Sequence, residues 1–92
     1  MKYFAVFLPM LDEEKSAKFR QEHLDYLAQC KREGKIFAYG RFVDGAGGLI
    51  IYQTETEEEA RSLAQNDPYV VRQARGCEIH EWDMKTDAVL PQ

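Results

Sequence analysis

The sequence lacks an excess of basic residues, a long apolar segment and a cysteine framework, and each absence excludes a class of protein. Lysine and arginine total 12 against 16 aspartates and glutamates, which gives a net charge of −4. The positive field that favours nucleic-acid backbones is missing, so we expect no nucleic-acid partner. The apolar run from Tyr3 to Met10 is far shorter than the roughly 18–20 residues that span a bilayer, and no signal-peptide features accompany it. We therefore expect a soluble, cytoplasmic protein with no membrane partner.

Cysteine is scarce as well, since Cys30 and Cys77 stand alone without C-x-x-C spacing. We expect two reduced, packed thiols rather than a disulfide framework. His23 and His80 show no ligand spacing either, so no metal site is predicted. What the chain does contain is apolar residues: 45% of its 92 residues are hydrophobic. These suffice for a single domain over residues 1–92, whose small core makes association with a second copy a reasonable expectation.

The hydrophobic pattern predicts the order strand, helix, strand, strand, helix, strand. Residues 2–8 are apolar at odd and even positions, which is typical of a central strand covered on both faces. Asp12 is placed to cap a helix that runs to about Arg32, and Thr56 with Glu59 forms a capping box for a second helix. The other strands are expected at residues 36–43, 49–52 and 77–84, and a loose or partner-wrapped tail at residues 85–92.

This order is that of a ferredoxin-like βαββαβ fold of the α+β class, in which both helices cover one face of a four-stranded antiparallel sheet. The other face would leave apolar side chains in water, because the last strand places Trp82 and Met84 opposite Cys77 and Ile79. Covering it with the same face of a second copy gives a symmetric homodimer. Cavities at the seam between sheet, helix and partner would be natural sites for a small-molecule ligand.

Two motifs suggest binding sites but have simpler explanations. The segment 44–48 is rich in glycine, but a phosphate cradle leads into a helix and this segment leads into a strand, so we predict a hairpin turn. Glu57, Glu58 and Glu59 stand in the first turn of a predicted helix. The helix dipole and solvent explain these glutamates without a metal ion.

The candidate for chemistry is His23, which lies on the apolar side of the first predicted helix. With 3.6 residues per turn, it shares that side with Phe19, Tyr26, Leu27 and Cys30. An inward imidazole is either a core residue whose hydrogen bonds are met by neighbours, or a group in a cavity whose proton chemistry is used. The periodicity leaves both interpretations open.

Several short motifs occur in order along the chain: Arg20-x-x-His23-Leu24, Gly34-Lys35, Tyr39-Gly40, Asp44-Gly45, Glu59-Ala60, Asp67-Pro68-Tyr69 and Trp82. Together they resemble the YciI-like (YCII-related) family, small proteins of the dimeric α/β-barrel type. The resemblance covers nearly the whole chain. It implies a ferredoxin-like dimer and kinship with cofactor-free enzymes that act on lactones and chlorinated ring-derived compounds, including dehydrochlorinases. Members often carry a glycine after the Asp-Pro-aromatic motif and a proline before the final tryptophan, where this chain has Gln73-Ala74 and Glu81.

The resemblance also implies a site formed by His23 and Asp67. A carboxylate bonded to one imidazole nitrogen fixes the tautomer and leaves the other nitrogen to take or give a proton. Asp67 has an alternative role as the cap of a short turn that begins at Pro68. Arg20, three residues before His23, is placed either to bind a substrate carboxylate by a forked contact or to lie at the surface with its stem packed.

Three aromatic residues, Tyr39, Tyr69 and Trp82, are candidates for substrate binding, although aromatic packing explains them equally well. The sequence thus predicts a cofactor-independent enzyme of lyase or isomerase type, in which His23 and Asp67 act on a small organic acid, lactone or ring-derived substrate. One alternative is a dimeric module with the same pocket that binds a ligand without turnover. Another is a purely structural association domain.

Overall fold

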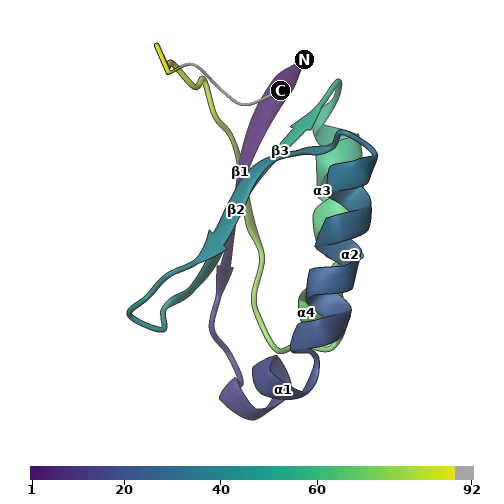
Figure 1. The fold of residues 1–92 in the computed structure, drawn as a ribbon, viewed down its shortest axis with the longest axis vertical. Coiled ribbons are helices and arrows are strands. Elements are labelled where there is room, and N and C mark those ends of the chain that lie inside the picture. Colours follow the sequence, from purple (N-terminus) through teal and green to yellow (C-terminus); the bar gives the residue numbers. More distant parts are fainter. Residues whose placement is uncertain (89–92) are drawn as a thin grey trace.

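The sheet of the protein has four strands, and all of its pairings are antiparallel (Figure 1). Their order across the sheet is β2-β3-β1-β4, so β1 lies in the interior, as its apolar residues on both faces predict. In the computed structural model, which describes residues 1–88, the strands are β1 (Lys2–Pro9), β2 (Ile36–Arg41), β3 (Gly47–Thr54) and β4 (Glu78–Glu81).

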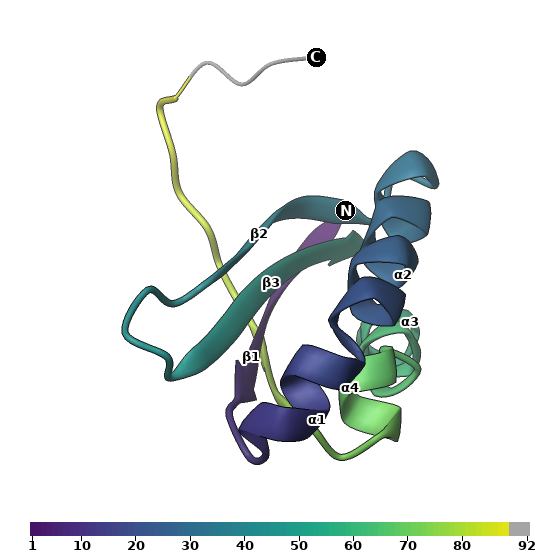
Figure 2. The same cartoon turned by 60° about the horizontal axis from the view of Figure 1, so that its bottom comes forward.

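The longer helices α2 and α3 cover one face of this sheet, and the shorter α1 and α4 lie near one end of them (Figure 2). Two predicted caps are present, since Asp12 accepts a hydrogen bond from the backbone N–H of Lys15 and Thr56 from that of Glu59. With α2 and α3 as crossover helices, the predicted ferredoxin-like fold is confirmed. The helices are α1 (Glu13–Lys18), α2 (Arg20–Arg32), α3 (Glu57–Gln65) and α4 (Pro68–Val71).

The prediction of one continuous helix over residues 12–32 is wrong at Phe19, whose backbone (φ −101°, ψ 12°) separates α1 from α2. The cause lies in the contacts of α1. The N–H groups of Leu11 and Asp12 donate to the carbonyl of Ala74, and so does the hydroxyl of Ser16. α2 contacts β2 and α4 instead. Because the two helices are tied to different parts of the fold, the chain turns between them (Figure 2).

The boundaries of all four strands also differ from the prediction, and β1 ends at residue 9 instead of 8. β2 ends at residue 41 instead of 43, β3 covers 47–54 instead of 49–52, and β4 covers 78–81 instead of 77–84. β4 pairs with β1 alone, and just after it the N–H of Trp82 donates to the carbonyl of Tyr3, near the start of β1. Residues 85–88 of the predicted tail are exposed and irregular, and residues 89–92 lie outside the described part of the chain.

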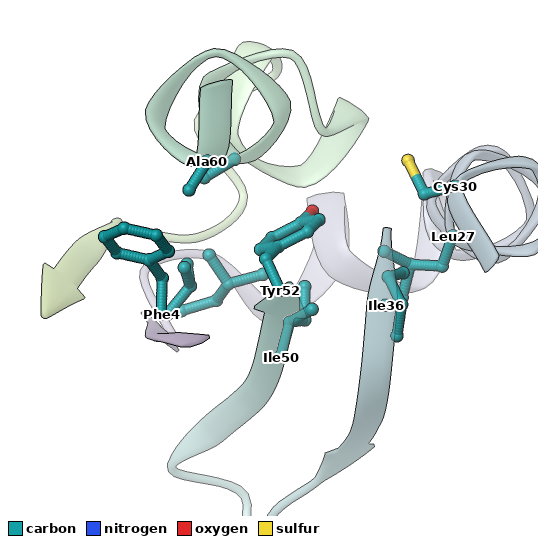
Figure 3. Packing of buried hydrophobic residues seen from close by; sticks show 10 residues of the cluster. Phe4, Leu27, Cys30, Ile36, Ile50, Tyr52 and Ala60 are labelled. Carbon is teal, nitrogen blue, oxygen red and sulfur yellow. The ribbon is translucent and has the colours of Figure 1, made fainter. Parts of the chain in front are cut away.

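The core fills the space between the sheet and the helices (Figure 3). Phe4, Ile50 and Tyr52 enter it from the sheet, and Leu27 and Ala60 from α2 and α3. Along β1, fully buried side chains alternate with partly buried ones. One side of β1 therefore supplies the core, and the other side contributes to the opposite surface of the sheet.

None of the described helices lies over that opposite surface, here called the outer face (Figure 1). Tyr3 and Phe37 meet edge to face with ring centres 5.4 Å apart, and Phe7 and Phe42 do so at 5.8 Å. Phe42 is 38% exposed and Trp82, next to Tyr3, is 45% exposed. The outer face is thus apolar, as predicted. Among the helices of residues 1–88, none is long and apolar enough to cross a membrane.

Candidate functional site

His23 and Asp67 are 44 residues apart in the sequence and in direct contact in the structure. His23 lies in the first turn of α2, and Asp67 is the residue that precedes α4. The Nδ1 atom of His23 is 2.8 Å from Oδ1 of Asp67. Since α2 and α4 pack together, the apolar side of α2 presents its imidazole to the start of α4.

The Asp67 side chain is fully buried, and its Oδ1 atom has two partners. Besides contacting His23, Oδ1 accepts a hydrogen bond of 2.9 Å from the backbone N–H of Tyr69 and so caps α4. The Oδ2 atom has no partner among the described residues. Both roles considered for Asp67, helix cap and histidine partner, are thus filled by the same oxygen atom.

The imidazole of His23 is held by Asp67 at its Nδ1 atom and by a stacked aromatic ring on one of its faces. The ring of Tyr69 stacks on it, with ring centres 4.0 Å apart and an angle of 13° between the planes. Tyr69 is fixed in turn, because its hydroxyl donates to the carbonyl of Ser16 at 3.0 Å, and burial raises the pKa of this phenol. Within the described residues, the Nε2 atom of His23 makes no hydrogen bond. His23 is therefore not a core residue with all its hydrogen bonds met.

A cavity of about 410 Å³ opens beside His23. Its floor is the helix-facing side of β2 and β3, and its walls come from α1, α2 and the segment after α4. The apolar part of the lining includes Leu8, Leu24, Leu27 and Ile50. Small-molecule sites typically measure about 300–1,000 Å³, so this cavity has the size of a site for a small ligand.

Tyr39 reaches the cavity because of an irregularity in β2. Ile36 pairs with Tyr52 and Tyr39 with Ile50, so three steps along β2 match two steps along β3. Regular alternation would place Ile36 and Tyr39 on opposite faces of the sheet. The bulge at Phe37 brings both side chains to the helix-facing side instead.

Of the four residues predicted to bind substrate, Arg20, Tyr39 and Tyr69 line this cavity together with His23. Trp82 does not line it. Trp82 follows β4, which forms the edge of the sheet opposite to β2. The structure therefore places three of the four residues in the cavity with the imidazole, and Trp82 at the opposite edge of the sheet.

The sequence did not single out Ser16, Arg41, Gly48 or Arg75, which also line the cavity. Alternation along β2 from Tyr39 could have found Arg41. Gly48 belongs to the glycine-rich segment that was assigned to a turn. Ser16 and Arg75 carry no local signal, because Arg75 lies in an irregular segment whose position depends on the whole fold.

The two thiols lie outside the cavity lining, and both are free. Burial raises the pKa of Cys30 and of Cys77, so both stay protonated at neutral pH. Within residues 1–88, no three histidine, cysteine, aspartate or glutamate side chains gather in a metal-binding group. The described ionisable groups at the cavity are thus His23, tyrosines and arginines.

The buried hydroxyl of Tyr52 permits a test of the hydrogen bonding in the core. Tyr52 is fully buried, its hydroxyl has no partner among the described residues, and burial raises its pKa. We expect Tyr52→Phe to leave the free energy of unfolding unchanged or to raise it by about 1 kcal/mol, as measured by urea denaturation. The matched change Tyr26→Phe should lower it by about 1 kcal/mol, because the Tyr26 hydroxyl donates to the Leu63 carbonyl at 2.7 Å. Equal losses in both variants would mean that Tyr52 has a partner.

Comparison with known proteins gives the family. The YCII-related domain matches residues 1–83 of this chain. The chain belongs to the YCII-related family. The family resemblance of its short motifs is thereby confirmed.

Two proteins are similar to this chain, one in sequence and one in structure. The uncharacterized protein YjpA of Bacillus subtilis (strain 168) is 29% identical over 75 residues, which cover 77% of this chain and 88% of YjpA. A solved structure of 5-chloro-2-hydroxyhydroquinone dehydrochlorinase (TftG) from Burkholderia phenoliruptrix AC1100, in complex with 2,5-dihydroxybenzoquinone, matches with a TM-score of 0.78. That match has 20% identity and covers 90% of this chain and 95% of the other. It shows that the two proteins share a fold.

Gln73, at the position where the family resemblance led us to expect a glycine, has a φ of 61°. This left-handed conformation costs a residue with a side chain about 1–2 kcal/mol, a cost that glycine would avoid.

Proposed function

We propose that this protein is a cofactor-independent enzyme in which His23, oriented by Asp67, transfers a proton on a small organic acid, lactone or ring-derived substrate. One observation carries the proposal: an imidazole on the wall of a cavity has its Nδ1 atom 2.8 Å from a fully buried carboxylate. A positioned acid or base of this kind contributes about 10²–10⁴ in rate.

The roles follow from the hydrogen bonds. Ionised Asp67 accepts the Nδ1 proton of His23, which leaves the lone pair of Nε2 for the substrate. In an elimination, Nε2 removes a proton from a carbon next to the C–Cl carbon or, in the keto form of a chlorinated hydroquinone, from a hydroxyl conjugated with a saturated C–Cl carbon. The C–H electron pair forms a new C=C bond, or the O–H pair forms a C=O bond while the ring double bond shifts to the C–Cl carbon. The C–Cl bond breaks, and chloride leaves with its electrons. The proton on the imidazolium, which Asp67 stabilises, then passes to water.

Two further observations support this reaction class. Tyr69 stacks on the imidazole and holds its plane, so Nε2 keeps a fixed direction. The solved structure with the same fold carries the name of a dehydrochlorinase, which makes chloride a reasonable leaving group to test. We assign Arg20 and Tyr39 to binding of the substrate, since both line the cavity, and Trp82 to the outer face.

The function is tested by turnover. We would incubate the protein with 5-chloro-2-hydroxyhydroquinone and measure chloride release, and follow exchange of the acidic C–H of a lactone in D₂O by NMR. Rates above those of buffer in either assay are expected. Binding of such compounds without chloride release or exchange would instead favour the alternative of a ligand-binding module. This alternative has one observation in its favour, because no cysteine, aspartate or glutamate joins His23 in the described cavity lining.

We also propose that two copies associate through their outer faces. The aromatic pairs of that face, Tyr3 with Phe37 and Phe7 with Phe42, lie on the side of the sheet without helices. Burying such a surface is favourable by about 25 cal/mol per Å² of apolar area. A symmetric dimer is the simplest way to cover it.

Light scattering coupled to size exclusion tests the dimer. We expect a mass of twice the chain mass of 10.7 kDa. Phe42→Glu should shift the mass to that of the single chain, because a charge would be buried in the contact. The control is Val71→Glu, at a residue of α4 that is 59% exposed, and this variant should remain dimeric. A wild-type mass near 10.7 kDa would contradict the proposal.

A further inference from the structure

At one end of the cavity lies a fixed arginine, Arg75, that neither the sequence motifs nor the His23–Asp67 pair accounts for. The chain reaches it through the turn at Gln73, after which the N–H groups of Ala74 and Arg75 both donate to the carbonyl of Tyr69, at 2.9 and 3.1 Å. This turn folds the segment back over α4 and directs the Arg75 side chain toward the cavity.

Two contacts hold the guanidinium of Arg75 in place. Its Nε donates to the hydroxyl of the buried Ser16 at 3.0 Å, and its central carbon lies 4.4 Å from the ring centre of Tyr69. A guanidinium has five N–H donors in one plane, and among the described residues only the Nε donor of Arg75 has a partner. The donors at its two terminal nitrogens are left for a ligand in the cavity.

The part of the cavity floor next to Arg75 is Gly48, which has no side chain. A Cβ atom at Gly48 would lie 3.6 Å from the Nη1 atom of Arg75, so Nη1 faces the bare backbone of β3. Gly48 therefore places no side chain against Nη1 of Arg75, a residue that lines the cavity.

The charges around the cavity favour an anion. Arg20, Arg41 and Arg75 line it, and no aspartate or glutamate is among its described lining residues. Within residues 1–88, none of the three forms an ion pair with a carboxylate. The chain as a whole carries a net charge of −4, so this positive cluster is not a consequence of overall composition. Clustered charge in a cleft concentrates ligands of the opposite sign.

The distance between Arg75 and the imidazole limits the size of that anion. The ring centre of His23 lies 4.0 Å and the guanidinium carbon of Arg75 4.4 Å from the ring centre of Tyr69, so their sum, about 8.4 Å, is the greatest possible separation. A six-membered ring with a single substituent has about this length, so a ligand of that size that lies along the edge of Tyr69 reaches both groups. A reacting C–H beside His23 and an acidic group beside Arg75 thus fit on one small ring.

We propose that Arg75 is the specificity-determining residue of the site, and that it binds the carboxylate of a small planar ring whose reacting carbon lies beside His23. The inference rests on the proposed function, because it takes the cavity beside His23 as the substrate site. A guanidinium binds a carboxylate by two parallel hydrogen bonds, which selects for this group over a neutral one. Arg20 and Arg41, whose side chains are exposed, attract the anion at the mouth without fixing it.

The test compares two probes that differ only in the carboxylate, 2,5-dihydroxybenzoate and 1,4-hydroquinone, by calorimetric titration of the wild-type protein. We expect the carboxylate probe to bind about 10- to 100-fold more tightly, as charge-assisted hydrogen bonds predict. Arg75→Gln should abolish this preference. Arg75→Lys keeps the charge but lacks the paired N–H donors of the guanidinium, so it should retain only part of the preference. Folding of each variant is checked by circular dichroism.

Two matched variants make the result specific. Arg72→Gln removes the same charge three residues away, at a side chain that pairs with Glu22 outside the cavity, and should change the preference less than twofold. His23→Ala should keep the preference, so a protein without turnover can still support the role of Arg75. The inference is overturned if hydroquinone binds wild type as tightly as the carboxylate, if the carboxylate does not bind at millimolar concentration, or if Arg75→Gln keeps the preference.

Discussion

Replacing His23 with glutamine is expected to slow turnover by about 10²–10⁴-fold, the usual contribution of a positioned acid or base. Glutamine fits the space of an imidazole and can hydrogen-bond to Asp67, but it cannot take up a proton at neutral pH. The measurement is the rate of chloride release or C–H exchange under saturating substrate. Equal rates in wild type and variant would remove His23 from the mechanism.

The control for this change is His80→Gln. His80 is the other histidine of the chain, and its side chain is 72% exposed on β4, 4.0 Å from Glu78. It is not among the residues that line the cavity. We expect this variant to keep the wild-type rate, so a loss in both variants would point to a general effect of the substitution.

Asp67→Asn separates the two roles of the carboxylate. Asparagine caps helices about as well as aspartate, so the free energy of unfolding should change by less than about 1 kcal/mol. The neutral amide cannot stabilise an imidazolium, so we expect the rate to fall at least about 10-fold. An unchanged rate would restrict Asp67 to its capping role.

Replacing Gly47 with alanine is expected to give the largest loss of stability, more than about 3 kcal/mol, because a strained backbone and a backbone clash add up. Gly47 has a φ of 141°, and an added Cβ would lie 2.1 Å from the carbonyl oxygen of Leu8, on the neighbouring strand β1. Neither atom belongs to a flexible side chain, so the strands themselves must separate. The check is the midpoint of urea denaturation.

Gly45→Ala is the matched control in the same hairpin. Gly45 also has a positive φ, of 86°, but an added Cβ would meet nothing within 4 Å. Only the conformational cost remains, and we expect a loss of about 1–2 kcal/mol. Similar losses in the two variants would show that the close approach of Gly47 to β1 is absent in solution.

The sequence predicted the fold where local signals and burial agree. The doubly apolar β1 and the caps at Asp12 and Thr56 are sufficient to order the elements, and the ferredoxin-like topology follows. The break at Phe19 was not predictable in this way, because neither glycine nor proline marks it. It depends on bonds between α1 and the carbonyl of Ala74, which is more than fifty residues away.

The candidate site was predictable only in part, for a similar reason. Periodicity turned His23 inward, and the family resemblance named Asp67, but only the packing of α2 on α4 brings them together. Regular alternation along β2 predicts that Tyr39 and Ile36 lie on opposite faces of the sheet, whereas a bulge places them on the same face. Arg75 lies in a segment without periodicity, so its place beside Tyr69 could be known only from the folded chain.

The double use of the Asp67 Oδ1 atom couples the motion of the backbone to the state of the site. The Tyr69 amide and the His23 ring share this acceptor, so α4 cannot open at its start without loosening the imidazole. Hydrogen–deuterium exchange at the single amide of Tyr69 therefore reports how often the pair comes apart, even before any substrate is known. A ligand that tightens the site would slow that exchange, which gives a readout of binding that requires neither turnover nor a chromophore.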